Sequence, residues 1–442
     1  MKLIIVCSLL SAVIATRAFL KPPEAGGKRW ALLVAGSKTW SNYRHQADIC
    51  HAYQILSRNG IPDERIVVMM YDDIAHNRKN PTPGIIINRP NGPDVYKNVP
   101  KDYTGSSVTP DTFLKVLQGD ANGVKDRGSG KVISSGPNDH VFVYFADHGA
   151  PGILAFPHHE LGVDELNNAI VSMHAKSQYK EMVFYVEACE SGSMFDKHLP
   201  TDIKNFYATT AANPHESSLA CYYDKERGTY LGDVYSVNWM EDSDKENLKV
   251  ETLQKQFEIV RNETTKSHVM EYGTMSLGNM TVAAFQGNNG SGNSNSWTQN
   301  PNIDAVPSQD VKFHILKNRY LRATESEKQA IMADINELMR TKMAVELTVH
   351  DIVHKTAKII NYSEDPKSTM NEIINSRLPL IKLDCYFGIY QHLKSECSTL
   401  GLPQNDYALR NLYAFVNMCE MGFPAAIVMS AISHTESCHV VY

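Results

Sequence analysis

Short apolar runs alternate with stretches of helical spacing between residues 29 and 285. Strands that are buried on both faces of a parallel sheet read as near-continuous hydrophobic runs, and helices connect them. The expected strands are residues 30–35, 66–70, 141–146 and 182–188, and the expected helices are residues 47–56 and 163–174. This alternation predicts an α/β domain on a mainly parallel sheet, with the Pro- and Gly-rich insertion at 80–105 as a surface loop.

A change of composition follows this region. Residues 287–302 are rich in Gly, Ser and Asn and offer little to bury, which is typical of a flexible linker. Further on, residues 328–345 and 346–360 have helical spacing with charged outer faces, and no strand-like run recurs. The predicted organisation is an export signal at 1–18, an α/β domain at 19–286, a flexible linker at 287–318 and a helical domain at 319–442.

The N-terminus has the features of an export signal. Lys2 precedes an apolar run at residues 3–14, and small residues follow it. The run is too short to cross a membrane, and no later run reaches ~18 apolar residues. Four acceptor sequons fit passage through the secretory pathway: Asn262, Asn279, Asn289 and Asn361.

Composition excludes several classes of protein. Hydrophobic residues make up 43% and charged residues 21% of the chain, which is typical of a globular protein and not of a disordered or fibrous one. Lys and Arg number 43 against 49 Asp and Glu, so the net charge is −6, and no basic stripe stands out. Nucleic-acid binding is therefore not expected.

The cysteines fall into two groups. Four of them lie close to the C-terminus, and in an exported chain they predict two disulfides with three possible pairings: Cys385, Cys397, Cys419 and Cys438. The others beyond the export signal, Cys50, Cys189 and Cys221, are scattered and are expected to be unpaired. A free thiol in an oxidising compartment calls for a functional explanation.

Two predicted strands end in residues with catalytic potential. Residues 141–146 run into Asp147, His148 and Gly149, and residues 182–188 run into Cys189. The carboxyl ends of parallel strands meet at one edge of a sheet, so the imidazole and the thiol are expected to lie close together. A thiol activated by an imidazole is the basic unit of a cysteine hydrolase, and the Gly149 amide could hold an oxyanion.

Each of these residues also has an ordinary interpretation. A lone cysteine at a strand end is usually a small buried apolar residue, and a lone histidine is more often structural than catalytic. Because the two residues follow matching strand ends, we give the catalytic and the structural interpretations equal weight.

Longer segments around the same residues resemble a known family. The segments YFADHGAPGILAFP and FYVEACESGSMF resemble the histidine and cysteine blocks of the legumain family of asparaginyl endopeptidases. The order of the two blocks is also similar to that in caspases. Further blocks, such as GSKTWSNYRHQADICHAYQIL and TYLGDVYSVNWMEDSD, extend the resemblance over residues 28–285 and, more weakly, over the cysteine-bearing tail. The resemblance implies a caspase-like, mainly parallel sheet flanked by helices, followed by a linker and an all-α C-terminal prodomain.

The resemblance also implies catalytic roles and a specificity pocket. Cys189 would be the nucleophile, His148 its proton acceptor and Asn42 the residue that orients His148, with the Gly149 and Cys189 amides as the oxyanion hole. The pocket for the substrate residue before the cleaved bond (P1) would consist of Arg44, His45, Glu187, Ser217, Ser218, Tyr230 and Asp233. A carboxamide both accepts and donates hydrogen bonds, so a cation beside carboxylates suits asparagine, and aspartate once acid protonates it. Without the resemblance, Arg44, Glu187 and Asp233 would read as an ordinary surface ion-pair cluster. Asp147 matches a position where the family carries an aspartate that can form a succinimide.

The tail resembles a prodomain that covers the active site and is released by self-cleavage at acid pH. The resemblance implies the disulfides Cys385–Cys419 and Cys397–Cys438, and the candidates for the cleaved residue are Asn300, Asn302 and Asn318. It also implies peptide ligase activity, protein and peptide substrates with Asn at P1, cystatin-type inhibitors, and a lysosomal, endosomal or secreted destination.

No cofactor or metal is expected. His350 and His354 have the spacing of a zinc-protease helix but lack the adjoining glutamate and an evident third ligand, so they are interpreted as solvated or capping histidines. Two alternative functions are a glycolipid-anchor transamidase and a protease inhibitor or binding protein that acts through its tail. The presence of Cys189, His148 and Asn42 argues against a purely non-enzymatic role.

Overall fold

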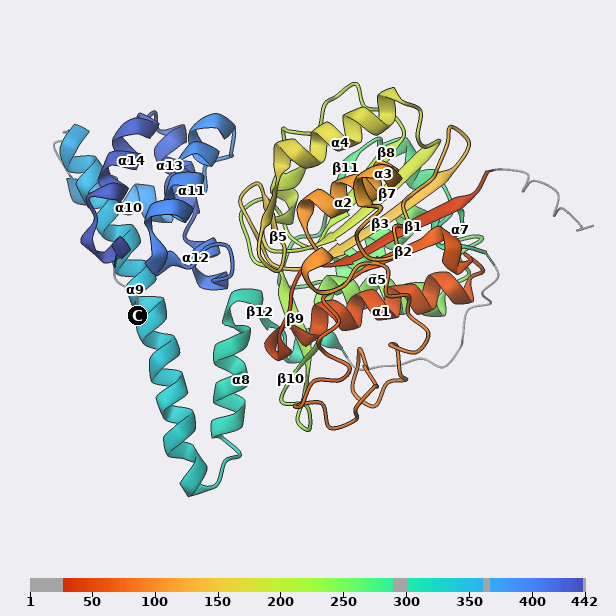
Figure 1. Cartoon of the computed structure of the whole chain (residues 1–442), viewed down its shortest axis with the longest axis horizontal. Coiled ribbons are helices and arrows are strands. Elements are labelled where there is room, and N and C mark those ends of the chain that lie inside the picture. The colour runs from red at the N-terminus through yellow and green to blue at the C-terminus, as the bar shows by residue number, and fades with distance from the viewer. Residues whose placement is uncertain (1–26, 289–299, 361–365, 440–442) are drawn as a thin grey trace, which may run out of the picture.

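A six-stranded sheet forms the centre of the larger domain. The computed structural model describes residues 27–288, 300–360 and 366–439, so the expected export signal lies outside the described residues (Figure 1). The strand order is β11-β8-β7-β3-β1-β2, and every neighbouring pair is parallel except β11 with β8. The bounds are β1 (Arg29–Ala35), β2 (Ile66–Met69), β3 (His140–Ala146), β7 (Glu181–Glu187), β8 (Phe206–Thr210) and β11 (Met270–Gly273). The predicted mainly parallel sheet is confirmed.

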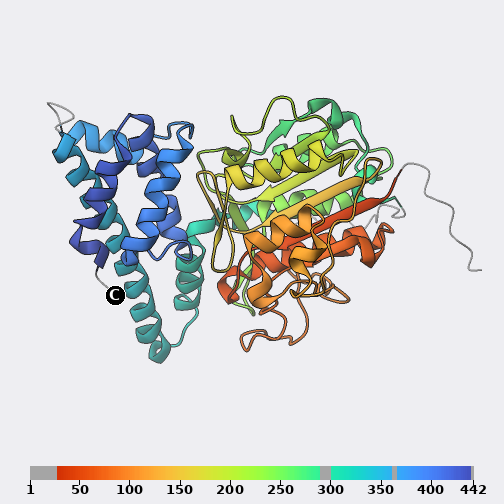
Figure 2. The same ribbon diagram turned by 45° about the horizontal axis from the view of Figure 1, so that its top comes forward.

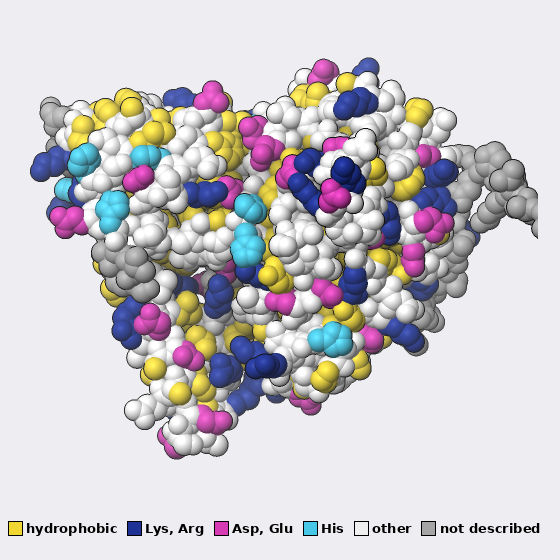
Figure 3. Space-filling model, viewed as in Figure 1, with side chains coloured by type: hydrophobic (Ala, Val, Ile, Leu, Met, Phe, Trp, Pro, Cys, Tyr) yellow, Lys and Arg dark blue, Asp and Glu magenta, His cyan; other side chains and the backbone are white. Residues whose placement is uncertain are grey.

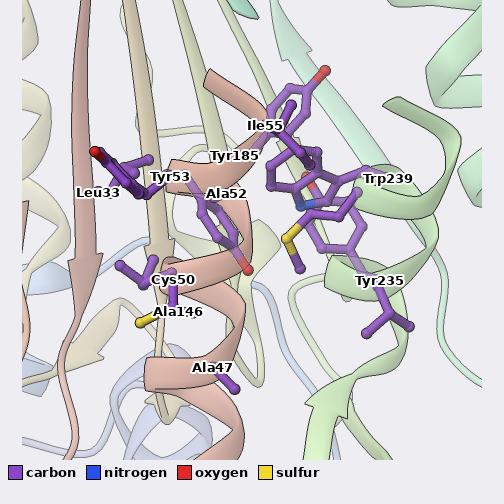
Figure 4. Close-up of a cluster of buried hydrophobic side chains, with 14 of the residues drawn as sticks. Leu33, Ala47, Cys50, Ala52, Tyr53, Ile55, Ala146, Tyr185, Tyr235 and Trp239 are labelled. Carbon is purple, nitrogen blue, oxygen red and sulfur yellow. The ribbon is translucent and has the colours of Figure 1, made fainter. Parts of the chain in front are cut away.

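Helices cover both faces of this sheet. One face carries α1 (Tyr43–Arg58), α5 (Val234–Lys245), α6 (Leu253–Glu263) and α7 (Ala283–Gln286), and the other carries α2 (Pro110–Leu117), α3 (Ala121–Val124) and α4 (Val163–Ala175). A cluster of buried hydrophobic side chains lies on each face. Successive strand side chains point to opposite faces, so Leu33 of β1 packs in the cluster under α1 and Leu32 in the cluster under α4. In the cluster under α1, Trp239 of α5 packs against Tyr185 of β7, with ring centroids 5.5 Å apart (Figure 4).

Two small sheets lie outside the main one and were not predicted. One consists of β4 (Gly149–Ala150), β5 (Ile153–Ala155) and β6 (Glu160–Gly162). The other has the order β10-β9-β12, from β10 (Thr229–Asp233), β9 (Leu219–Asp224) and β12 (Val306–Pro307). Because β4 begins directly after His148 and β10 ends at Asp233, both sheets frame the region of the expected active site.

The C-terminal part is helical, as expected, in α8 (Val311–Tyr320), α9 (Glu325–Ile360), α10 (Pro366–Asn375), α11 (Leu383–Glu396), α12 (Asp406–Arg410), α13 (Tyr413–Glu420) and α14 (Ala425–Ser433). Disulfides join Cys385 to Cys419 and Cys397 to Cys438, which is the pairing that the resemblance implied. The helices α8 and α9 form a hairpin that projects below the remaining helices (Figure 2). None of the helices in the described ranges is long and apolar enough to span a membrane.

One sequence-based boundary differs from the structure. The expected linker at 287–318 is structured from residue 301 onwards, because Val306 and Val311 are buried against Ala220 and Tyr230 of the β9–β10 hairpin. The helical spacing noted at 328–345 and 346–360 is confirmed, since both ranges lie in one continuous helix, α9.

The insertion at 80–105 is largely irregular, as expected, but it is not only a surface loop. Its residues Ile86, Ile87 and Asn88 are buried. Two of the four sequon asparagines, Asn262 and Asn279, are exposed and open to glycosylation, whereas Asn289 and Asn361 lie outside the described residues.

Candidate active site

The ends of β3 and β7 bring the histidine and the cysteine to one edge of the sheet. These strands are parallel neighbours, and Ala146 pairs with Glu187, so His148 and Cys189 lie two residues beyond the same level. The Asp147 amide donates to the Glu187 carbonyl at 3.0 Å. A Cβ atom added to Gly149 would lie 2.2 Å from the Cys189 carbonyl oxygen. The two turns are therefore in direct contact, and only a glycine fits at position 149.

The Cys189 thiol is buried and rests in its neutral form. Its Sγ lies 3.4 Å from the Ser217 hydroxyl and 3.9 Å from that of Ser218. Burial and the adjacent Glu190 carboxyl raise the pKa of Cys189 to about 12, and hydrogen bonding at Ser217 and Ser218 only partly opposes this rise. The thiolate, the form that attacks carbonyls, is therefore suppressed in this closed state.

Asn42 fixes the orientation and the tautomer of His148. The Asn42 amide nitrogen donates to the Lys38 carbonyl at 3.0 Å, so its Oδ1 atom faces His148 Nε2, also at 3.0 Å. Nε2 must then carry the proton, which leaves Nδ1 as the basic nitrogen. Burial lowers the pKa of His148 to about 4, with Arg44 and Lys312 adding to the effect and Asp406 opposing it. His148 is thus neutral, as a general base must be.

A buried charged pocket adjoins this pair. The Arg44 Nε atom donates to Asp233 Oδ1 at 2.8 Å, and His45 Nε2 lies 3.6 Å from Asp233 Oδ2. Glu187 Oε2 accepts from the amide and hydroxyl of Ser236 at 3.1 and 2.9 Å. Arg44, Glu187 and Asp233 are at most 1% exposed, so the interpretation as a surface ion-pair cluster is wrong.

The remaining expected pocket residues are divided between the thiol and the rim. Ser217 and Ser218 contact Cys189, as described above. Tyr230 instead packs its ring against Tyr223, with centroids 5.2 Å apart, beside Val306 and Val311. Six of the seven expected pocket residues, Arg44 among them, thus lie together near Cys189, whereas Tyr230 lies at the edge of the pocket.

Sequence reasoning missed Asp48, a buried carboxyl one helical turn after Arg44. Asn88 donates to Asp48 Oδ1 at 2.7 Å. Neither Asp48 Oδ2 nor Asp233 Oδ2 accepts a hydrogen bond from an N–H or O–H donor among the described residues. Burial and the nearby Asp233 charge raise the pKa of Asp48 well above its ordinary value. A protonated Asp48 can therefore share its proton with Asp233. The spacing of four from Arg44 within a helix was the available signal.

A segment before α8 occupies the pocket. Its strand β12 pairs antiparallel with β9, and Ser308 accepts from Arg44 at 2.6 Å and lies 3.5 Å from His148 Nδ1. Gln309 accepts a hydrogen bond from the Ser217 hydroxyl. An added strand whose side chains enter a pocket is the way in which extended peptides bind a sheet edge, and this segment is held in the same manner.

The helical domain closes the site from the other side. Asp406 at the start of α12 lies 3.5 Å from His148 Nε2 and 3.1 Å from Lys312. Side chains of β4 and β5 share one buried cluster with those of the tail helices, and Lys394 pairs with Glu160 at 2.5 Å. In the space-filling view the two domains abut along the upper part of their boundary (Figure 3). No sequence pattern signals these contacts, because more than two hundred residues separate the partners Asp406 and His148.

The fold and the site together define a cysteine peptidase in a closed, zymogen form. The sequence model described as "Peptidase C13 family" matches residues 29–288, and the one described as "Legumain, prodomain" matches residues 333–438. The chain belongs to the peptidase C13 family, the legumain family, as the sequence resemblance indicated.

Relatives match over almost the whole length. Legumain of Mus musculus is 52% identical over 424 residues, which are 95% of each chain, and legumain of Homo sapiens is 50% identical over 93% of this chain and 94% of its own. The vacuolar-processing enzyme of Vicia sativa is 40% identical over 92% of this chain and 86% of its own. Among solved structures, caspase-1 of Spodoptera frugiperda matches with a TM-score of 0.33 and 11% identity over 56% of this chain and 87% of its own.

Proposed function

We propose that this cysteine endopeptidase cleaves peptide bonds after asparagine, and after aspartate in acid. The observation that supports this specificity is the buried Arg44–Asp233 pair beside Glu187, next to the Cys189 turn. Arg44 would donate to the P1 carboxamide oxygen, and the carboxylates would accept from its NH₂ group. An apolar P1 side chain would leave these buried groups unpaired, which is the basis for rejecting it.

The contact between the two turns supports the following catalytic roles. On substrate binding His148 Nδ1 takes the proton of Cys189 Sγ, which attacks the carbonyl carbon, and the Gly149 and Cys189 amides stabilise the resulting oxyanion. The proton then passes to the leaving amine as the peptide bond breaks. Water hydrolyses the thioester and regenerates the thiol, and an incoming amine in place of water would yield a ligated peptide.

Activation would require cleavage in the segment that leads to β12 and departure of the tail. Among the candidate residues Asn300 is exposed, Asn302 is bound through its amide to the Glu263 carbonyl, and Asn318 lies within α8. A helical residue must unwind to enter an extended binding cleft. We therefore favour Asn300 and Asn302 over Asn318 as the first cleavage position.

His148 should make tail release sensitive to acid. Its pKa is held at about 4 in the closed state and would return towards 6.5 once the tail no longer buries it. The open state then binds a proton that the closed state does not. Closure is therefore fully stable above pH ~6.5 and weakens as the pH falls towards 4, by about 3 kcal/mol at most. Protonation of Asp406 also weakens closure, but only below this pH window. The reason is that His148 and Lys312 outweigh the effect of burial and hold the pKa of Asp406 below its ordinary value.

The measurement is amide hydrogen exchange at residues 306–310 in the uncleaved Cys189→Ala chain, corrected for intrinsic exchange rates. Opening should increase between pH ~6.5 and 4, and His148→Gln should remove most of that increase. His350→Gln, which removes an exposed histidine of α9, serves as the control. An unchanged pH dependence in His148→Gln would exclude His148 as the acid sensor.

The proposed specificity is tested with fluorogenic peptides that differ only at P1. After acid activation we expect hydrolysis of the Asn peptide, slower hydrolysis of the Asp peptide that improves in acid, and no hydrolysis of the Ala peptide. Equal rates for Asn and Ala would refute the pocket assignment. No turnover by protein that has lost its tail would instead favour the inhibitor or binding function. The match to a legumain prodomain disfavours the transamidase alternative.

Membership of a peptidase family implies protein substrates. We further propose passage through the secretory pathway to an acidic compartment, in agreement with the vacuolar-processing enzymes among the relatives. Cystatin-type inhibitors and succinimide formation at Asp147 remain proposals from the family resemblance.

A further inference from the structure

Three buried side chains at the active-site edge have the composition of a metal site. One ligand atom each from His45, Asp147 and His148 lies within 4.8 Å of the others, and none of the three residues is more than 6% exposed. The His45 Nδ1 and Asp147 Oδ1 atoms are 3.3 Å apart. Two ligands of a tetrahedral zinc ion, with bonds of about 2.0–2.1 Å, are separated by about the same distance. Only His148 would have to move appreciably to complete the set.

Asp147 supplies the observation that points to a ligand. Its Oδ1 atom is buried and has no hydrogen-bond partner among the described residues. The peptidase mechanism gives this carboxyl no role. A buried carboxyl oxygen that faces an imidazole nitrogen and lacks a donor can be satisfied by its own proton or, in a cluster of three ligands such as this one, by a bound cation.

The second nitrogen of each ring faces an oxygen atom, within hydrogen-bond distance for His148 and just beyond it for His45. His45 Nε2 faces Asp233 Oδ2 at 3.6 Å, and His148 Nε2 donates to Asn42 Oδ1 at 3.0 Å. Zinc-binding histidines usually donate their other N–H to a carboxylate or carbonyl in this way. Both rings therefore offer Nδ1, whose present partners are the hydroxyls of Ser37 at 2.7 Å and Ser308 at 3.5 Å.

An approach to these ligands exists in the full chain. A cavity of about 130 Å³ is lined by Asp147 and His148 on one side and by Lys312, Gln404 and Asp406 on the other. It has room for an ion with a coordinated water. The positive charges near the three ligands are Arg44 and Lys312. The acidic groups Asp233, Asp406 and the ligand Asp147 itself offset them.

We propose that His45, Asp147 and His148 form a binding site for a divalent transition-metal ion of the zinc type, with water as the fourth ligand. Three protein ligands and one water is the arrangement of an open zinc site. The bound ion occupies the nitrogen that His148 needs to accept the thiol proton, so metal binding inhibits the peptidase. The site is inhibitory and does not take part in the reaction.

The test uses the uncleaved full chain with Cys189→Ser, which removes the thiol as a ligand and prevents self-processing. Co²⁺ is the probe, because its visible absorption reports four-coordinate geometry, and Zn²⁺ is then added to displace it. We expect one Co²⁺ per chain with a tetrahedral spectrum. His45→Gln and Asp147→Asn, each introduced separately, should weaken binding by about 10- to 100-fold or more.

His350→Gln is the matched control, since it removes an imidazole from the other spaced histidine pair and should leave Co²⁺ affinity unchanged. Thermal unfolding and intact mass establish that each variant is folded and that Asp147 has not lost water to form a succinimide. Absence of a tetrahedral Co²⁺ spectrum in the folded Cys189→Ser chain overturns the proposal. Binding that survives both ligand substitutions, or that disappears in His350→Gln, overturns it as well. The measurement needs no peptidase activity, so its failure and that of the proposed specificity are separate results.

Discussion

Cys189→Ala is expected to abolish both peptide hydrolysis and self-processing. Loss of a catalytic nucleophile lowers kcat by about 10⁴- to 10⁶-fold, because only binding and oxyanion stabilisation remain. The substitution removes a single Sγ atom in contact with two serine hydroxyls, so the closed fold should persist. Residual kcat/KM on an Asn peptide and retention of the tail after acidification provide the two readouts.

Cys50→Ala is the appropriate control for this experiment. Cys50 is another buried free cysteine, but its thiol lies 3.9 Å from the Met70 sulfur in the hydrophobic core and has no role in the proposed reaction. It should retain activity with at most a modest loss of stability. Processing of the purified Cys189→Ala chain at the normal rate, without added enzyme, would mean that another nucleophile acts.

Arg44→Ala is expected to lower kcat/KM for Asn substrates by about 10³-fold or more and to remove the preference for Asn over Ala. Arg44 is fully buried, and its loss would leave Asp233 without the cation that faces it at 2.8 Å. The unpaired buried charge should also destabilise the fold by about 3–5 kcal/mol. Thermal unfolding measured alongside the kinetics separates the two effects.

Two further variants sharpen this test. Arg44→Lys keeps the charge but not the planar fork of donors, so it should fold better than Arg44→Ala and still select Asn poorly. Arg58→Ala removes an arginine from the end of the same helix, where it is half-exposed and pairs with Asp244 at the surface. It should behave as the unmodified enzyme. An Asn-to-Ala ratio that is unchanged in Arg44→Ala would remove Arg44 from the pocket.

The parts of this molecule that the sequence predicts are those encoded in local patterns. The apolar runs that became β1, β3 and β7 are continuous, and His148 and Cys189 follow two of them directly, so their meeting at one sheet edge required only the rule for parallel strands. The Arg44–Asp233 pair is 189 residues apart in the chain, and only the family resemblance brought its members together. Asp48 lies one helical turn after Arg44 in α1, so helical spacing alone places it on the same face of the helix.

The closing contacts are of a different kind. Ser308 and Asp406 are ordinary polar residues in segments without a motif, and their positions depend on how an entire helical domain docks. The boundary of the linker failed for the same reason. Residues 301–310 are too polar and too short to register as elements. Their position depends on contacts with distant segments, such as the pairing of Val306 with β9 and the backbone amides of β9 that donate to Asp304.

The strand β12 remains joined to α8 and the tail if the chain is cut at Asn300 or Asn302, and this has a kinetic consequence. Before the cut, the covering segment rebinds at an effective concentration of roughly millimolar or above, since it is tethered to the domain that it covers. After the cut, recapture becomes a second-order encounter whose rate falls with dilution. Cleavage of a single bond would thus turn a reversible opening into an effectively irreversible one, to a degree set by how far the released tail is diluted.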